Sequence, residues 1–101
     1  MVEPSPTFDV LVRDEPAASR YELHVDGEFA GFADYHLQPG LITVLSTEID
    51  PAFTGQGLGA TFIARMLKDI RSRGTKVLAV CPFVRAYLQR HPENSDLVWK
   101  P

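Results

Sequence analysis

Cysteine is almost absent from this chain of 101 residues, because Cys81 is the only one. A single cysteine excludes an internal disulfide and suits a reducing compartment. No stretch reaches the ~18 apolar residues that a membrane-spanning helix requires. Residues 1–6 also lack the basic and apolar segments of a signal peptide. We therefore expect a cytoplasmic protein that does not associate with a membrane.

The chain also lacks an excess of positive charge. Its 10 basic residues are outnumbered by 13 acidic ones, and the formal net charge is −3. This sign argues against nucleic acid as a partner. His24 and His36 show no metal-ligand spacing, so no metal is expected. The hydrophobic share of 45% is ordinary. We expect one domain over residues 1–101, loose at 1–6.

Hydrophobic periodicity predicts an α/β protein with the order β-β-β-α-β-α. The predicted strands span residues 20–25, 28–36, 41–49 and 76–80, with weaker candidates at 8–12 and 96–100. The turn signals Asp26-Gly27 and Pro39-Gly40 separate the first three, which should form an antiparallel meander. Residues 13–18 are expected to form a loop. Alternation in the second strand should place on one face Phe29, Gly31, Ala33 and Tyr35.

Two helices are predicted in the second half of the chain. The apolar face of the first is expected to consist of Leu58, Phe62, Met66 and Ile70. Gly74 is a natural end for this helix. The second helix is predicted at 83–90, with Pro82 at its first position and Pro92 beyond its end. The strands on either side of the first helix should run parallel, joined by a right-handed crossover.

The strongest functional signal is the glycine loop, residues 53–60, with the sequence Phe-Thr-Gly-Gln-Gly-Leu-Gly-Ala. Alternate glycines let the backbone approach a ligand, and a helix N-terminus adds unpaired N–H donors. Together they predict an anion site, most plausibly for phosphate. A glycine-rich turn with no ligand is the alternative. The loop lacks the Lys-Ser/Thr of a Walker motif and the distant acidic residue of a dinucleotide fingerprint.

Two further motifs accompany this loop and point to a family. The run Thr47-Glu48-Ile49-Asp50-Pro51, followed by the glycines, resembles the acetyl-CoA loop of the GNAT acetyltransferase superfamily. Cys81-Pro82-Phe83-Val84 and Arg90-His91-Pro92-Glu93 resemble its small, single-domain YjdJ-type branch. The resemblance covers about Tyr21 to Trp99. It implies a GNAT-like fold, in which the meander continues into a βαβ unit with splayed parallel strands.

The resemblance also implies where acetyl-CoA, or coenzyme A (CoA), would bind. The pyrophosphate would lie on backbone N–H groups of Gly55, Gln56, Gly57, Leu58, Gly59 and Ala60. The pantetheine arm would lie between the splayed strands, against the backbone of Thr47, Glu48 and Ile49. Thr54 stands where the superfamily has Arg or Gln. The helices that cover the acceptor site of larger members are missing.

Four side chains are candidates for chemistry or ligand contact. Cys81 precedes a predicted helix, a position that favours a nucleophilic thiolate; lining the CoA pocket or a structural role are the alternatives. Glu48 is the candidate base, acting through water, or else a solvent-facing carboxylate. Arg90 would meet the 3′-phosphate of CoA or solvent. His91 would contact the ligand or cap its helix.

The sequence thus predicts an acetyl-CoA-binding N-acetyltransferase that acts on an unidentified primary amine. Two other functions stay open. One is a CoA- or acyl-CoA-binding module without turnover, and the other is an interaction domain that lost its ligand. The acceptor is a small molecule or a protein, and we expect a monomer or a weak dimer.

Overall fold

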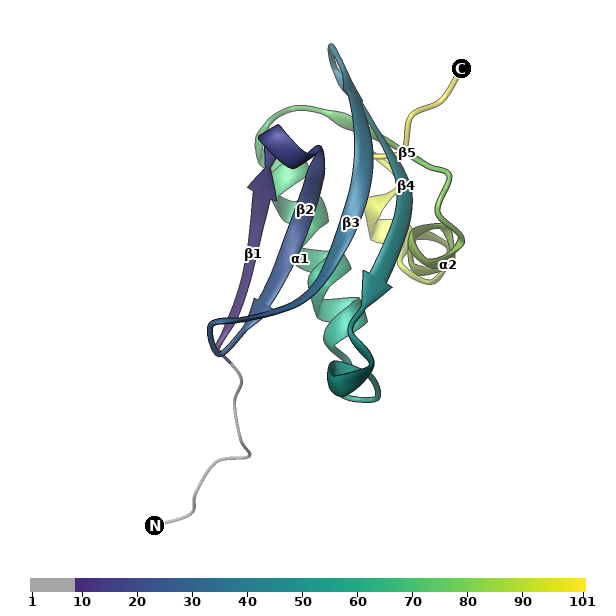
Figure 1. The fold of residues 1–101 in the computed structure, drawn as a ribbon. Helices are drawn as coiled ribbons and strands as arrows, with labels where there is room; N and C mark the ends of the chain where they lie inside the picture. The colour runs from purple at the N-terminus through teal and green to yellow at the C-terminus, as the bar shows by residue number, and fades with distance from the viewer. Residues whose placement is uncertain (1–8) are drawn as a thin grey trace.

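The computed structural model describes residues 9–101, which form one mixed sheet and two helices (Figure 1). The strands, in their order across the sheet, are β1 (Val10–Glu15), β2 (Arg20–Val25), β3 (Glu28–Gln38), β4 (Leu41–Ile49) and β5 (Lys76–Ala79). The helices are α1 (Leu58–Ser72) and α2 (Pro82–Arg90), and the short turns are η1 (Pro16–Ala18), η2 (Pro51–Phe53) and η3 (Pro92–Asn94). Strands β1 to β4 are antiparallel, and β5 is parallel to β4. The predicted α/β order is confirmed.

The N-terminal strand differs from the prediction. It continues to Glu15, so the prediction of a loop at 13–18 is wrong for residues 13–15, which belong to the strand. Pro16 begins the single turn η1, and Ser19 follows with a left-handed φ of 52°. This tight connection lets Glu15 pair with Arg20. Of the strand predicted at 8–12, Phe8 lies outside the described residues, as do residues 1–6.

The core lies between the sheet and α1, which packs across one face (Figure 1). Alternate residues of β2 point into it, and Tyr21, Leu23 and Val25 are buried. The predicted apolar face of α1 is confirmed, since it buries Leu58, Phe62, Met66 and Ile70, together with Ile63 and Leu67. Gly74 ends the helix with a φ of +69°, as the sequence predicted.

A β-bulge in β3 changes which face Phe29 occupies. Leu23 pairs with Gly31 while His24 pairs with Phe29, so Ala30 is an extra residue and is fully buried. The predicted alternation therefore fails at Phe29, whose side chain is 43% exposed. Its ring stacks with that of Phe32 at a centroid distance of 6.3 Å. Both rings lie on the face of the sheet opposite α1.

Strands β4 and β5 separate halfway along β4. Their pairing ends at Val44 and Ala79, but β4 continues to Ile49. The backbone N–H groups of Val80 and Cys81 both donate to Val44 O, each at 3.0 Å, as the chain leaves the sheet toward α2. The splayed parallel strands are confirmed. The edge strand expected at 96–100 is reduced to one bridge between Val77 and Val98.

Two tyrosines connect the sheet to the end of α1 through a hydrogen-bonded network. Tyr21 donates to Asp69 and Tyr35 to Asp14, both at 2.6 Å, and Arg73 pairs with both carboxylates. Burial is the main cause that raises the pKa of each tyrosine well above its usual range, and the carboxylate partners add to it. The network therefore keeps both hydroxyls protonated in the folded protein.

We expect this network to make stability fall in alkaline solution. The unfolded chain releases tyrosine protons near pH 10, before the folded protein does. The contribution of the network is therefore complete below about pH 10 and is lost as the pH rises toward the raised pKa values. Tyr21→Phe should cost about 1 kcal/mol at pH 7 and flatten this loss. Urea unfolding of the parent and of Tyr21→Phe, at pH 7 and at higher pH, measures the cost and the pH dependence of the free energy of unfolding. An equal decrease with pH in the two proteins would contradict this expectation.

Candidate functional site

The glycine loop joins β4 to α1 through two left-handed residues. Asp50 begins the connection by accepting the N–H of Ala52 at 2.9 Å, which fixes the turn η2. Gly55 and Gly57 then adopt φ values of +80° and +72°. Residues with a Cβ atom are disfavoured at such φ values, so the backbone geometry of the loop favours glycine at both positions. Gly57 is the N-cap of α1, and no side chain caps the helix.

Six consecutive backbone N–H groups in this loop are without a partner. Among the described residues, no hydrogen bond is donated by the backbone of Gly55, Gln56, Gly57, Leu58, Gly59 or Ala60. The first helical bond of α1 is from Thr61 N to Gly57 O. Unpaired donors at a helix N-terminus carry a partial positive charge. The loop therefore offers an anion the set of donors that the sequence predicted.

A cavity of about 220 Å³ lies beside the loop. It is lined by Ile49 of β4, by Phe53, Thr54, Gly55, Gly57, Leu58 and Gly59, and by Phe83 of α2. A Cβ added to Gly59 would be 2.6 Å from the Phe83 ring, so this glycine admits the aromatic side chain. Phe83 was not among the site residues predicted from the sequence, because only the packing of α2 brings its ring opposite Gly59.

Cys81 and Thr47 face each other across the separated strands. Cys81 is the N-cap of α2, so its predicted place at a helix N-terminus is confirmed. Its side chain is only 2% exposed, and its Sγ is 3.5 Å from Thr47 Oγ1. The carboxyl ends of the separated strands β4 and β5 thus lie at the same edge of the sheet as the glycine loop, where ligands of parallel strands usually bind.

Glu48 and Ile49 point in different directions from the end of β4. Glu48 lies opposite Phe32 on the open face of the sheet and is exposed. Ile49 is partly buried against the core and lines the cavity at the loop. Two consecutive residues of β4 therefore serve different faces: Glu48 places a carboxylate on the open face, and Ile49 forms an apolar wall of the cavity on the other side.

Arg90 and His91 lie at the other end of α2 from the loop. Phe83, near the first turn, touches Gly59, and Arg90 is two turns further on, about 10 Å along the axis. The His91 ring stacks on Tyr87 at 4.0 Å, and its Nδ1 is 3.2 Å from a Glu93 carboxylate oxygen. The structure does not bring Arg90 or His91 into the cavity lining, and their contact with CoA stays a prediction.

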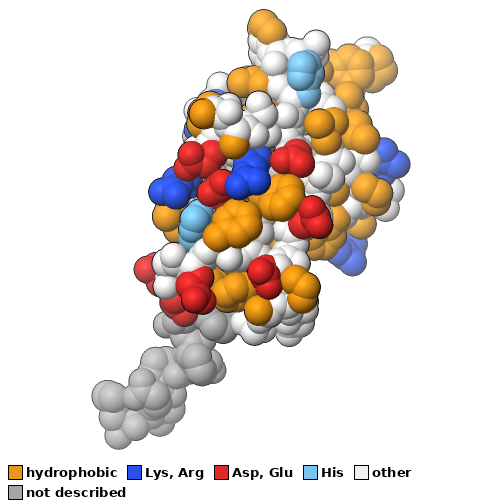
Figure 2. Space-filling view, viewed as in Figure 1, with side chains coloured by type: hydrophobic (Ala, Val, Ile, Leu, Met, Phe, Trp, Pro, Cys, Tyr) orange, Lys and Arg blue, Asp and Glu red, His pale blue; other side chains and the backbone are white. Residues whose placement is uncertain are grey.

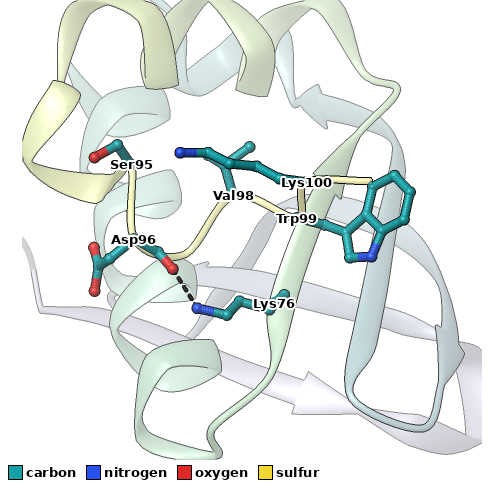
Figure 3. Close-up of a pocket in the computed structure, with 6 residues that line it drawn as sticks. All are labelled: Lys76, Ser95, Asp96, Val98, Trp99 and Lys100. Carbon is teal, nitrogen blue, oxygen red and sulfur yellow. Dashed lines mark hydrogen bonds between the residues drawn. The ribbon is translucent and has the colours of Figure 1, made fainter.

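A more spacious cavity, of about 450 Å³, lies elsewhere, at the opposite end of β5 (Figure 3). Lys76, the first residue of β5, donates there to the backbone carbonyl of Asp96, and Trp99 and Lys100 complete the rim (Figure 3). Within residues 9–101, no cluster of three or more His, Cys, Asp or Glu side chains could hold a metal ion. No helix of this part of the chain is long and apolar enough to cross a membrane.

Comparison with protein families identifies the class to which this fold and loop belong. The family model of the GCN5-related N-acetyltransferases matches residues 20–97, which is most of the chain. The protein therefore belongs to this family. The narrower resemblance to the YjdJ-type branch stays a prediction. No curated protein matches the sequence significantly.

Solved structures share the fold. A GCN5-like protein from Staphylococcus aureus has a TM-score of 0.67 at 15% identity, with 90% of this chain and 89% of that chain covered. The ribosomal-protein-S18-alanine N-acetyltransferase from Escherichia coli has a TM-score of 0.59 at 20% identity over 70% of this chain. That alignment covers 49% of the E. coli enzyme, so the chain spans about half its length. At these identities the likeness concerns the fold.

Proposed function

We propose that the protein binds acetyl-CoA at the glycine loop and transfers the acetyl group to a primary amine. The observation that carries this proposal is the row of six unpaired N–H groups beside the gap between β4 and β5. A pyrophosphate on these donors directs the rest of the ligand toward Thr47 and Cys81. Membership in the N-acetyltransferase family supports the proposal, as does the shared fold of the ribosomal-protein-S18-alanine N-acetyltransferase from Escherichia coli.

The residues around the gap have distinct roles in the proposed transfer. The side of β4 that faces away from β3 lacks strand pairing beyond Val44, so its backbone N–H groups can stabilise the oxyanion. Glu48 accepts a proton from the ammonium group of the acceptor, which frees the nitrogen lone pair to attack the thioester carbonyl. As the C–N bond forms and the C–S bond breaks, the second proton of the nitrogen passes to the leaving CoA thiolate. Phe53 and Phe83 form apolar walls of the cavity at the loop.

Cys81→Ser separates direct attack by the amine from a route through an acetylated cysteine. Because the thiol is almost fully buried and Glu48 is exposed, we expect the variant to keep most of its turnover. We also expect no adduct of about 42 Da, the mass of an acetyl group, on the parent protein. Mass spectrometry after incubation with acetyl-CoA tests this. An adduct on the parent, lost together with turnover in Cys81→Ser, would establish the covalent route.

Calorimetric titration with acetyl-CoA and CoA tests the proposal as a whole. We expect micromolar binding, and release of free thiol when a primary amine is added. Binding without thiol release over a broad amine panel would support the alternative function, a CoA-binding module without turnover. Thr54 in place of Arg or Gln and the uncovered face of the sheet are also consistent with that alternative. Absence of heat at millimolar ligand would overturn the proposal.

A further inference from the structure

The open face of the sheet carries an aromatic and acidic patch next to Glu48. Hydrophobic side chains lie in the middle of this face, with acidic and basic groups around them (Figure 2). The stacked rings of Phe29 and Phe32 belong to the apolar part, with planes 19° apart. The bulge at Ala30 is what brings Phe29 to this side. Apolar surface is therefore exposed beside the candidate base.

A cavity of about 170 Å³ lies in this patch, and we call it the open-face pocket. It is lined by Phe29, Phe32, Glu48 and Asp50, together with Ile49. Ile49 also lines the cavity at the glycine loop, so the two spaces share one lining residue of β4. An apolar cavity of about 150 Å³ is known to hold benzene. The open-face pocket therefore matches a ligand with one small apolar group.

The charges around the pocket are mostly negative. Arg20 lies over both rings, 5.0 Å from the Phe32 centroid and 5.4 Å from that of Phe29. Its guanidinium is already paired with Glu22, through Nε at 2.9 Å and Nη2 at 2.8 Å. A hydrogen bond from His24 is the main cause that lowers the pKa of Glu22, and Arg20 adds to it. Arg20 is therefore neutralised by its own partner.

Glu48 and Asp50 have no such partner. Among residues 9–101, the Glu48 carboxylate makes no hydrogen bond or ion pair, and the Asp50 side chain accepts only backbone N–H from Ala52. Asp34, on the same face, accepts from Ser46. Two carboxylates beside two aromatic rings form a site for a cation with an apolar body.

We propose that the open-face pocket binds the acetyl acceptor, and that this acceptor is a small primary amine carrying an apolar or aromatic group. Its ammonium group lies at Glu48 and Asp50, and its apolar group lies against the parts of Phe29 and Phe32 that line the pocket, beside the guanidinium of Arg20. This inference rests on the proposed acetyl transfer. It places the amine beside the group that accepts its proton, in a pocket that shares Ile49 with the cavity at the glycine loop.

Titration of the protein with 2-phenylethylamine, followed by backbone amide NMR shifts, tests the pocket. We expect saturable shifts centred on Phe29, Phe32 and Glu48. The neutral analogue 2-phenylethanol should bind roughly tenfold more weakly, because it lacks the ammonium group. Shifts centred elsewhere, or equal affinity for the two compounds, would overturn the proposal.

Two variants and a control separate charge from ring contact. Glu48→Gln/Asp50→Asn should weaken binding roughly fivefold to tenfold, the scale of one or two exposed ion pairs, and Asn keeps the oxygen that accepts from Ala52. Phe29→Ala should also weaken binding, and its exposure means that the fold survives. Glu28→Gln removes an exposed carboxylate outside the pocket and should change nothing. Unchanged affinity in both pocket variants would refute the assignment.

The titration needs no acetyl-CoA, so the two proposals fail separately. Amine binding in the pocket without any acetyl-CoA binding would overturn the proposed donor site alone. Acetyl-CoA binding without amine binding would overturn the pocket alone. Acetylation of a peptide N-terminus by a protein that ignores small amines would likewise overturn the pocket and assign the acceptor to protein substrates.

Discussion

Gly57→Glu is expected to abolish acetyl-CoA binding while leaving the protein folded. The new carboxylate would stand at the N-cap of α1, among the unpaired N–H groups. Two like charges about 4 Å apart repel by about 4 kcal/mol at a protein surface. The dissociation constant should therefore rise roughly 100-fold or more. Calorimetric titration measures it, and an unchanged value would refute the placement of the pyrophosphate.

Gly40→Glu is the matched control for this variant. Gly40 has a φ of +73°, nearly the value of Gly57, and a Cβ at either position meets no atom within 4 Å. Both variants thus pay the same strain of about 1 kcal/mol for a side chain in left-handed geometry and add the same charge. Gly40 lies in the turn between β3 and β4, at the other end of the strand from the glycine loop. We expect Gly40→Glu to bind acetyl-CoA like the parent, and loss of binding in both variants would point to strain.

Phe62→Ala is expected to remove a large part of the stability of the domain. The Phe62 side chain is fully buried on the inner face of α1. Truncation of a buried phenylalanine costs about 3–5 kcal/mol, because apolar contacts are lost and a cavity remains. Small domains are stable by only about 5–15 kcal/mol. Chemical unfolding should therefore show a midpoint shifted far toward low denaturant.

Leu11→Ala tests whether burial causes this loss. Leu11 is also a large apolar residue, but half of its side chain is exposed on the edge strand β1. Its truncation should change the free energy of unfolding by about 0.5 kcal/mol or less. A loss in Leu11→Ala as large as in Phe62→Ala would mean that the core between α1 and the sheet is not the main source of stability.

The strand order and both helices were predictable because their signals are local. The turns at Asp26-Gly27 and Pro39-Gly40 require backbone geometry that few other residue pairs adopt. The inner face of α1 follows from spacing that matches the helical period. The unpaired N–H groups of the glycine loop were predictable for the same reason, since they belong to neighbouring residues, and the anion that they would bind stays a prediction. The turns, the inner face of α1 and the glycine loop each depend on fewer than about twenty consecutive residues.

The less predictable features depend on pairs of segments that are distant in sequence. A bulge is set by both strands, so the exposure of Phe29 could not be read from the alternation of β3 alone. Phe83 reaches the glycine loop because α2 packs where Gly59 leaves room. The tyrosine network likewise joins residues up to 59 positions apart, as in the pair of Asp14 and Arg73.

Local sequence thus determined the elements, their order along the chain and the row of unpaired N–H groups in the glycine loop. Tertiary packing established which side chains accompany those donors: Cys81 against Thr47 across the separated strands, and Phe83 in the wall of the cavity at the loop. It also placed Glu48 and Phe32 on a face that no described helix covers. The physical reason is that backbone geometry responds to nearest neighbours, whereas the environment of a side chain depends on every segment packed around it.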